Sequence, residues 1–197
     1  MALMKLARMG HPVLRSTASP VENPDAPEVS ALVRDMMETM ADAGGVGLAA
    51  PQVHVARRVV VFHVPPQRAG DPDARDGAED GAVPLTVLIN PEIEPLSDER
   101  VSDWEACLSV PGLVGLVPRF ARIRYRWTDL DGQRRERTAA GFHARVVQHE
   151  CDHLDGILYP QRVANLTHVG FVEEMRQYPP AGATAAPEEQ KTADERQ

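Results

Sequence analysis

Cysteine and aromatic residues are scarce in this chain of 197 residues, which has two cysteines and is 5% aromatic. Two cysteines cannot form the dense disulfide framework of a small secreted domain, and they fit a protein of a reducing compartment. No apolar run approaches the roughly 20 residues of a membrane-spanning helix. The first ten residues are too short and too interrupted by charge for a signal peptide. We therefore expect a cytoplasmic protein that does not enter a membrane.

Positive charge is also in deficit, with 21 lysines and arginines against 29 aspartates and glutamates and a net charge of −8. Such a chain is a poor ligand for a phosphate backbone, so we expect no DNA binding. The length suits one domain with a substantial core. We place this domain at residues 1–178, with a mobile surface insertion at 65–84 and a disordered acidic tail at 179–197, where the composition turns polar and rich in proline.

The sequence does contain the motif H-E-x-x-H, within residues 148–153. On a helix, His149 and His153 lie one turn apart on the same face, so both imidazoles can hold one divalent metal ion. Glu150 lies on the same side, about 60° from His153, where its carboxylate can take a proton from water. A chance occurrence would leave two ordinary histidines beside a solvated glutamate. Because apolar residues precede the motif at helical spacing, we expect this face to look inward, which favours a metal-dependent hydrolase.

Hydrophobic periodicity predicts a mixture of helices and strands. Residues 27–43 carry apolar side chains at helical spacing behind a capping box that starts at Asp25. A second helix, over 141–156, carries the metal-binding motif. We expect the strand that begins at Leu85 to stop at Asn90-Pro91. Strands are predicted where β-branched residues accumulate or alternate with polar ones: 58–64, 85–89, 121–127 and 133–138.

Three separated segments resemble the motifs of the peptide deformylase family: GVGLAAPQ at 45–52, EACLS at 105–109 and QHECDH at 148–153. They stand in the family's order within roughly residues 5–165, and together they are highly specific. The resemblance implies an α+β fold in which antiparallel or mixed β-sheets surround a C-terminal metal-binding helix, with a long N-terminal helix packed on the core. It also implies a metal-dependent hydrolase that removes the N-formyl group from the N-terminal methionine of newly synthesised polypeptides and releases formate.

The resemblance supplies a third metal ligand, the thiolate of Cys107, beside His149 and His153. Cys107 lies outside the helix and is free to approach the open side of the two histidines. Cys151 lies about 200° around the helix from His149 and must point away from the ion. The family implies Fe²⁺ in the cell, and Zn²⁺, Ni²⁺ or Co²⁺ would also suit two imidazoles and a thiolate.

The same resemblance assigns the catalytic groups. Glu150 is the general base that takes a proton from water and returns it to the leaving amine. The side-chain amide of Gln52 and the backbone N–H of Leu108 stabilise the charge that develops on the formyl oxygen.

Substrate binding is assigned to residues on either side of these groups. The peptide backbone is expected to lie as an extra strand along Val46 and Gly47. Phe142 and Val146 match positions of the methionine slot, although plain core packing would explain them as well. Ala106 replaces the glycine that the family usually has. If that position requires a positive φ, alanine costs about 1 kcal/mol; otherwise its methyl group narrows the space beside the substrate.

Two alternatives share part of this pattern. A zinc endopeptidase would take a third ligand downstream, at His168 or at 173–174, and would leave Cys107 unexplained. A deacylase of altered scope would follow from Ala106. We expect a monomer that acts on N-formyl-methionyl nascent peptides and touches the ribosome transiently, although the acidic tail is a poor partner for ribosomal RNA.

Overall fold

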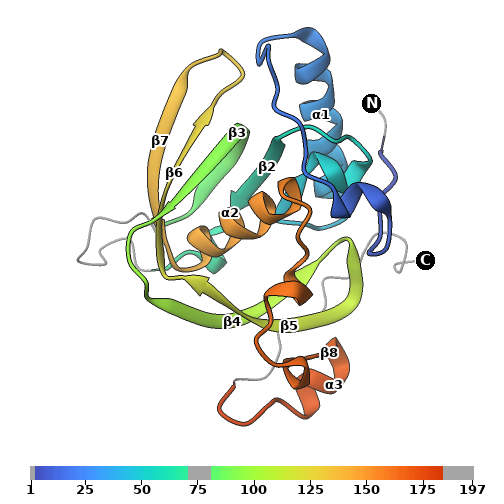
Figure 1. Cartoon of the computed structure of the whole chain (residues 1–197), viewed down its shortest axis with the longest axis vertical. Coiled ribbons are helices and arrows are strands. Elements are labelled where there is room, and N and C mark those ends of the chain that lie inside the picture. The colour runs from blue at the N-terminus through green and yellow to red at the C-terminus, as the bar shows by residue number, and fades with distance from the viewer. Residues whose placement is uncertain (1–2, 71–80, 184–197) are drawn as a thin grey trace.

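Two antiparallel β-sheets and the helix between them form the centre of the molecule (Figure 1). The computed structural model describes residues 3–70 and 81–183. One sheet has five strands in the order β1-β2-β3-β6-β7, and the other has three in the order β4-β5-β8. Helix α2 (Gly141–Leu154) crosses the middle, with the five-stranded sheet on one side and β4 and β5 on the other. This is the α+β arrangement that the sequence predicts.

Along the chain, groups of one to three consecutive strands belong in turn to the five-stranded and the three-stranded sheet. The five-stranded sheet consists of β1 (Gly47–Ala49), β2 (Val59–Val64), β3 (Val83–Pro95), β6 (Arg122–Thr128) and β7 (Arg134–Ala140). The three-stranded sheet consists of β4 (Arg100–Cys107), β5 (Val110–Phe120) and β8 (Val169–Phe171). The other α-helices of the described ranges are α1 (Pro27–Asp42) and α3 (Val172–Gln177). Short 3₁₀ turns connect them: η1 (Pro12–Arg15), η2 (Ala50–Val53), η3 (Pro66–Arg68), η4 (Tyr159–Arg162) and η5 (Leu166–His168).

Helix α2 is buried along nearly its whole length because both sheets cover it. Every residue from His143 to Leu154 is buried. A surface helix usually buries only one stripe, so the polar side chains of α2 must find partners inside the protein. This burial is what fixes the positions of the motif residues.

Helix α1 packs the apolar stripe predicted from its spacing against β1 and β2, with Val33, Met36 and Met40 in the contact. The helix begins at Pro27, as expected, since proline suits the first helical position. The predicted side-chain cap is wrong. Ala26, in an extended conformation, occupies the N-cap position and makes no side-chain hydrogen bond, which leaves Asp25 one residue too early to cap the helix.

Strand β3 continues through the Asn-Pro pair at which the sequence predicts its end. Asn90 has a φ of 51°, and the register with β6 shifts between Ile89 and Glu92. The Asn90 side chain accepts a hydrogen bond from the Val21 backbone N–H and donates one to the Val21 carbonyl, both at 2.8 Å. A β-bulge therefore absorbs the pair without ending the strand.

The predicted insertion and tail are only partly described. Residues 71–80, the middle of the insertion at 65–84, and residues 184–197 of the tail lie outside the described residues. The described ends of the insertion are ordered into η3 and the start of β3. None of the helices in the described ranges has the length and apolar character needed to span a bilayer.

Candidate active site

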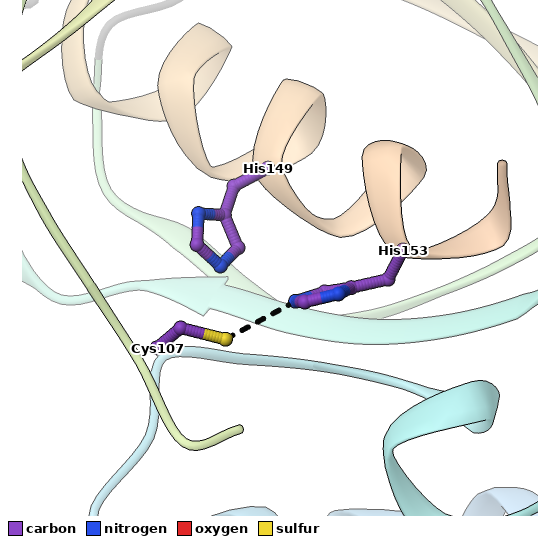
Figure 2. A group of neighbouring side chains, drawn as sticks. All are labelled: Cys107, His149 and His153. Atoms are coloured by element: carbon purple, nitrogen blue, oxygen red, sulfur yellow. Dashed lines mark hydrogen bonds between the residues drawn. The ribbon is translucent and has the colours of Figure 1, made fainter. Parts of the chain in front are cut away.

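Three side chains from two elements meet beside α2. Cys107 ends β4, while His149 and His153 project from α2 one turn apart. Their potential ligand atoms all lie within 4.8 Å of one another. In Figure 2 both imidazoles point away from the helix toward the sulfur atom, which approaches from the opposite side and lies 3.3 Å from Nε2 of His153.

The second cysteine lies elsewhere, on the far side of the helix from these imidazoles. Cys151 is buried in the apolar cluster that includes Val60 and Leu154. Burial raises the pKa of its thiol, so it remains protonated and behaves as a small apolar side chain. Neither cysteine forms a disulfide. The structure thus separates the two cysteines in the way that helix geometry predicts.

The cluster of Cys107, His149 and His153 fits a divalent metal ion. Two imidazoles and a thiolate form a donor set suited to soft or borderline ions, and three protein ligands leave a position open for chemistry. Burial lowers the pKa of His153 well below its ordinary value, which keeps the imidazole neutral, as a ligand must be. Burial also opposes the charged form of His149, but hydrogen bonds to Cys107 and Glu105 raise its pKa well above the ordinary value. A metal ion would compete with that proton for the same lone pairs.

Glu105 fixes the imidazole of His149 through the ring nitrogen Nδ1. Its carboxylate accepts four hydrogen bonds of 2.8 Å: two from Arg119, one from Arg145 and one from Nδ1 of His149. Burial would raise the pKa of Glu105, but the hydrogen bonds from Arg119 and His149 outweigh it and hold the pKa well below the usual range. Because an ionised carboxylate can only accept, Nδ1 of His149 carries the hydrogen and Nε2 keeps its lone pair for a metal.

Arg119 extends this network from the strands to the helix. Besides the two bonds to Glu105, it donates to the buried carboxylate of Asp152 on α2. Arg162, from η4, donates to both oxygens of the same carboxylate. Two buried carboxylates are therefore fully paired, and the strand that carries Cys107 is tied to the helix that carries the histidines.

Sequence reasoning did not identify Glu105, Arg119 or Arg145 as part of this site. Glu105 could have been found, since it begins the EACLS segment. Arg145 also gave a signal, because a charged residue four positions before His149 on an inward helical face requires a buried partner. Arg119 gave none: it lies in a strand, and its partners are 14 and 33 residues away in the chain.

Gln52 lies at the wall of the site and is 2% exposed. Its side-chain oxygen accepts a hydrogen bond from the Ala49 backbone N–H at 2.8 Å. This bond turns the amide nitrogen toward Ser109 Oγ, at 3.3 Å, and Cys107 Sγ, at 3.5 Å. The amide donor therefore faces the three-residue cluster. Leu108, in the turn between Cys107 and Ser109, lines the same pocket.

Glu150 is buried against Gly47. Burial raises the pKa of Glu150 to about 7, and its Oε2 has no hydrogen-bond partner among the described residues. A Cβ atom at position 47 would lie 2.3 Å from Oε1 of Glu150, so this close approach requires glycine. A carboxylate with a free oxygen and a pKa near neutrality is suited to accept and return a proton.

A pocket of about 1010 Å³ opens onto this centre. All the residues assigned to substrate binding line it: Val46, Gly47, Ala106, Phe142 and Val146. Ala106 is exposed, and among non-glycine residues of the described ranges only His54 and Asn90 have a positive φ. The backbone strain considered for Ala106 is therefore not present, and its methyl group faces the pocket space.

Comparisons with known proteins identify the family of this chain. The family model for polypeptide deformylase matches residues 3–169. Peptide deformylase 1 of Bordetella pertussis is 56% identical over 168 residues, which is 85% of this chain and 92% of that protein.

Two solved structures are similar as well. The peptide deformylase from Ehrlichia chaffeensis has a TM-score of 0.76 at 34% identity, covering 85% of this chain and 91% of that one. A class I type b peptide deformylase from Acinetobacter baumannii, with Met-Ala-Ser bound, has a TM-score of 0.70 at 35% identity, covering 82% and 100%. The relative and the two structures each cover 82–85% of the chain. Together with the match to the family model, this shows that the chain belongs to the polypeptide deformylase family.

Proposed function

We propose that this enzyme hydrolyses the formamide bond of N-formyl-methionyl peptides at the cluster of Cys107, His149 and His153. The observation that carries the proposal is the convergence of three metal-ligating groups, two of which line the same pocket as the buried carboxylate of Glu150. Family membership supports the same reaction. The endopeptidase alternative needs a downstream ligand, but His168 and Glu173 are not part of this cluster, whereas Cys107 is.

The metal would be held by the Cys107 thiolate and the two imidazoles. A divalent ion there supplies a Lewis acid that polarises a carbonyl group and lowers the pKa of water. We propose Fe²⁺ as the ion in the cell, as the family resemblance implies, with Zn²⁺, Ni²⁺ and Co²⁺ as ions that the same donor set accepts. Elemental analysis of protein purified without oxygen, paired with activity, identifies it.

Glu150 is the proposed group that accepts and then donates the proton. With a pKa of about 7, its carboxylate is substantially ionised at neutral pH and can accept a proton from the attacking water. The water oxygen forms a bond to the formyl carbon, and the carbon–nitrogen bond then breaks. Glu150 returns the proton to the leaving α-amine, so the products are formate and a peptide with a free N-terminal methionine.

Gln52 and Leu108 would stabilise the formyl oxygen as it gains negative charge. The bond from the Ala49 N–H to the Gln52 side chain fixes the direction of its amide nitrogen before substrate arrives. A donor that is already oriented costs no reorganisation during the reaction, which is why such donors accelerate it. The backbone N–H of Leu108 is the second proposed donor.

The substrate backbone would pair with the free edge of the five-stranded sheet. β1 has a neighbouring strand on one side only, and Val46 and Gly47 line the pocket on the other. An extended peptide can add to such an edge through main-chain hydrogen bonds. Phe142 and Val146 would then form the apolar slot for the methionine side chain. We also propose that the enzyme is a monomer. It would act in the cytoplasm, where nascent chains emerge from the ribosome.

One assay separates the candidate functions. Formate release should be rapid with formyl-Met-Ala-Ser, while acetyl-Met-Ala-Ser and casein should remain intact. Glu150→Gln is the matched variant: it should keep the metal content of the wild type and lose nearly all turnover, because the ligands remain and the base is gone. Cleavage of casein would favour the endopeptidase, cleavage of the acetyl peptide a broader deacylase, and full activity of Glu150→Gln would contradict the mechanism.

A further inference from the structure

We propose that the mouth of the active-site pocket selects formyl-methionyl peptides that carry an acidic side chain shortly after the methionine. This preference rests on the proposed deformylase function and narrows its substrate class. It arises from a group of exposed basic residues that line the pocket, which we call the basic mouth: Lys5, Arg8, His11, His54 and Arg68.

Burial separates the floor of the pocket from its mouth. Of the lining residues of the reaction centre, His149, Glu150 and Gln52 are buried and Cys107 is half-buried, whereas all members of the basic mouth are exposed. A volume of about 1010 Å³ is at the upper end for a ligand site and exceeds the needs of one methionine side chain. A peptide whose formyl group lies at the floor would therefore extend toward the exposed lining residues, which include the basic mouth.

The N-terminal arm is fixed beside the reaction centre. The Ala7 N–H donates to the Gln52 carbonyl at 2.8 Å, and the Met9 N–H donates to the Ser109 carbonyl at 2.7 Å. These bonds attach the arm to both segments that flank Cys107. Arg8 lies between the two anchored residues and is exposed, so its guanidinium is held at the pocket without being buried.

Two further contacts place the other basic side chains. The rings of His11 and His54 meet edge to face, with centroids 4.6 Å apart. Nδ1 of His11 accepts from the Val13 N–H, which leaves Nε2 as a donor in the neutral ring. The guanidinium of Arg68 lies 4.8 Å from the centroid of the Phe142 ring, at the methionine slot. Contact with the Phe142 ring covers one face of the Arg68 guanidinium and leaves the N–H edge of the guanidinium available for a carboxylate.

The charges of the basic mouth find no neutralising carboxylate within residues 3–70 and 81–183. Among the described residues, Lys5, Arg8 and Arg68 form no ion pair with a carboxylate, unlike the arginines of β6. Within the described part of the chain, the acidic residues that line the pocket are Asp42, Glu105 and Glu150. Glu105 is already paired with arginines and Glu150 is the proposed base, so among the described lining residues Asp42 alone is left to offset the three permanent positive charges.

The local charge acts on a substrate although the whole chain carries −8. Charges farther away than a Debye length, about 8 Å at physiological ionic strength, are largely screened. The charges of the basic mouth would lie beside the part of the bound peptide that leaves the pocket. Exposed ion pairs are individually weak, so two or three of them together should change kcat/KM by about 3- to 10-fold. Because this attraction is electrostatic, it must shrink as salt is added.

The test compares three peptides with blocked C-termini: formyl-Met-Ala-Glu-amide, formyl-Met-Ala-Ser-amide and formyl-Met-Ala-Lys-amide. We expect kcat/KM to fall in that order, with a total span of about 3- to 10-fold at low salt and a much smaller one near 0.5 M salt, where the Debye length falls to about 4 Å. Arg8→Glu, and separately Arg68→Glu, should narrow or reverse the order. The control is Arg134→Glu, an exposed residue of β7 outside the pocket, which should preserve the order.

The outcomes separate the two levels of inference. Equal rates for the three peptides, a preference for lysine, or an unchanged order in both mouth variants would overturn the acidic preference while leaving the deformylase function intact. If none of the formylated peptides is hydrolysed by the metal-loaded enzyme, the proposed function falls and the preference falls with it.

Discussion

A methyl group at position 47 tests whether the placement of Glu150 controls the rate. In Gly47→Ala the new Cβ would lie 2.3 Å from Oε1, 2.6 Å from Cδ and 2.8 Å from Cγ of Glu150. Favourable contact between such atoms begins at about 3.5 Å, so the carboxylate must move by about 1 Å. Rotating the carboxylate alone cannot relieve the clash, because Cγ is also too close. Glu150 is 5% exposed and has little room to retreat.

A displacement of about 1 Å at a reacting group can lower the rate by about 10²-fold. Overpacking should also destabilise the fold by about 1–3 kcal/mol, which lowers Tm by about 2–12 °C in a chain of this size. We therefore expect kcat/KM for formate release from formyl-Met-Ala-Ser to fall by about 10²-fold, while metal content stays at the wild-type level. The control is Gly81→Ala, whose Cβ would meet no atom within 4 Å. Wild-type kcat/KM in Gly47→Ala would refute the assigned role of Glu150.

Three further tests, with four variants, address separate parts of the site. Gln52→Ala should lower kcat by about 10²-fold or more, as loss of one oxyanion donor does elsewhere; an effect confined to KM would show that Gln52 binds only the ground state. Cys107→Ser should empty the metal site, because a neutral hydroxyl is a poorer ligand than a thiolate, whereas Cys151→Ser should keep both the metal and formate release. Metal content per chain checks the two variants. A site that is empty in Cys151→Ser and filled in Cys107→Ser would exclude the proposed ligand set. Arg119→Met should destabilise the protein by about 3–5 kcal/mol, because two buried carboxylates lose their shared partner; thermal unfolding measures it, and a Tm within about 2 °C of the wild type would show that the network contributes little.

The parts of the site that follow from local geometry were predictable from the sequence. A helix places His149 and His153 on one face and turns Cys151 away, whatever surrounds it. The place of Cys107 depended on the family resemblance, since nothing in its local pattern brings β4 to the helix. Family motifs likewise located Gln52 and the pocket residues.

The remaining features depend on contacts between distant segments. Asn90-Pro91 is a local signal for a turn, but a paired interaction with Val21, 69 residues away, converts it into a bulge. Arg126 pairs with Glu94 and Glu136 of the neighbouring strands, and no local signal in the sequence predicts either partner. Periodicity reports which face of a strand is apolar, but it does not report which charges lie opposite one another across a sheet.

The burial of α2 has a consequence for hydrogen exchange. Its amide hydrogens are covered by two sheets, and its last carbonyl, that of Leu154, accepts a hydrogen bond from the Ala18 N–H at 2.8 Å. Unwinding this helix from its end would expose the apolar faces of both sheets, so its amides should exchange with solvent only when the whole molecule opens. The reaction centre thus belongs to the slowest-exchanging part of the protein. Adjustment to peptides of different length and shape must then come from the exposed side chains at the mouth of the pocket, while the histidines stay in place.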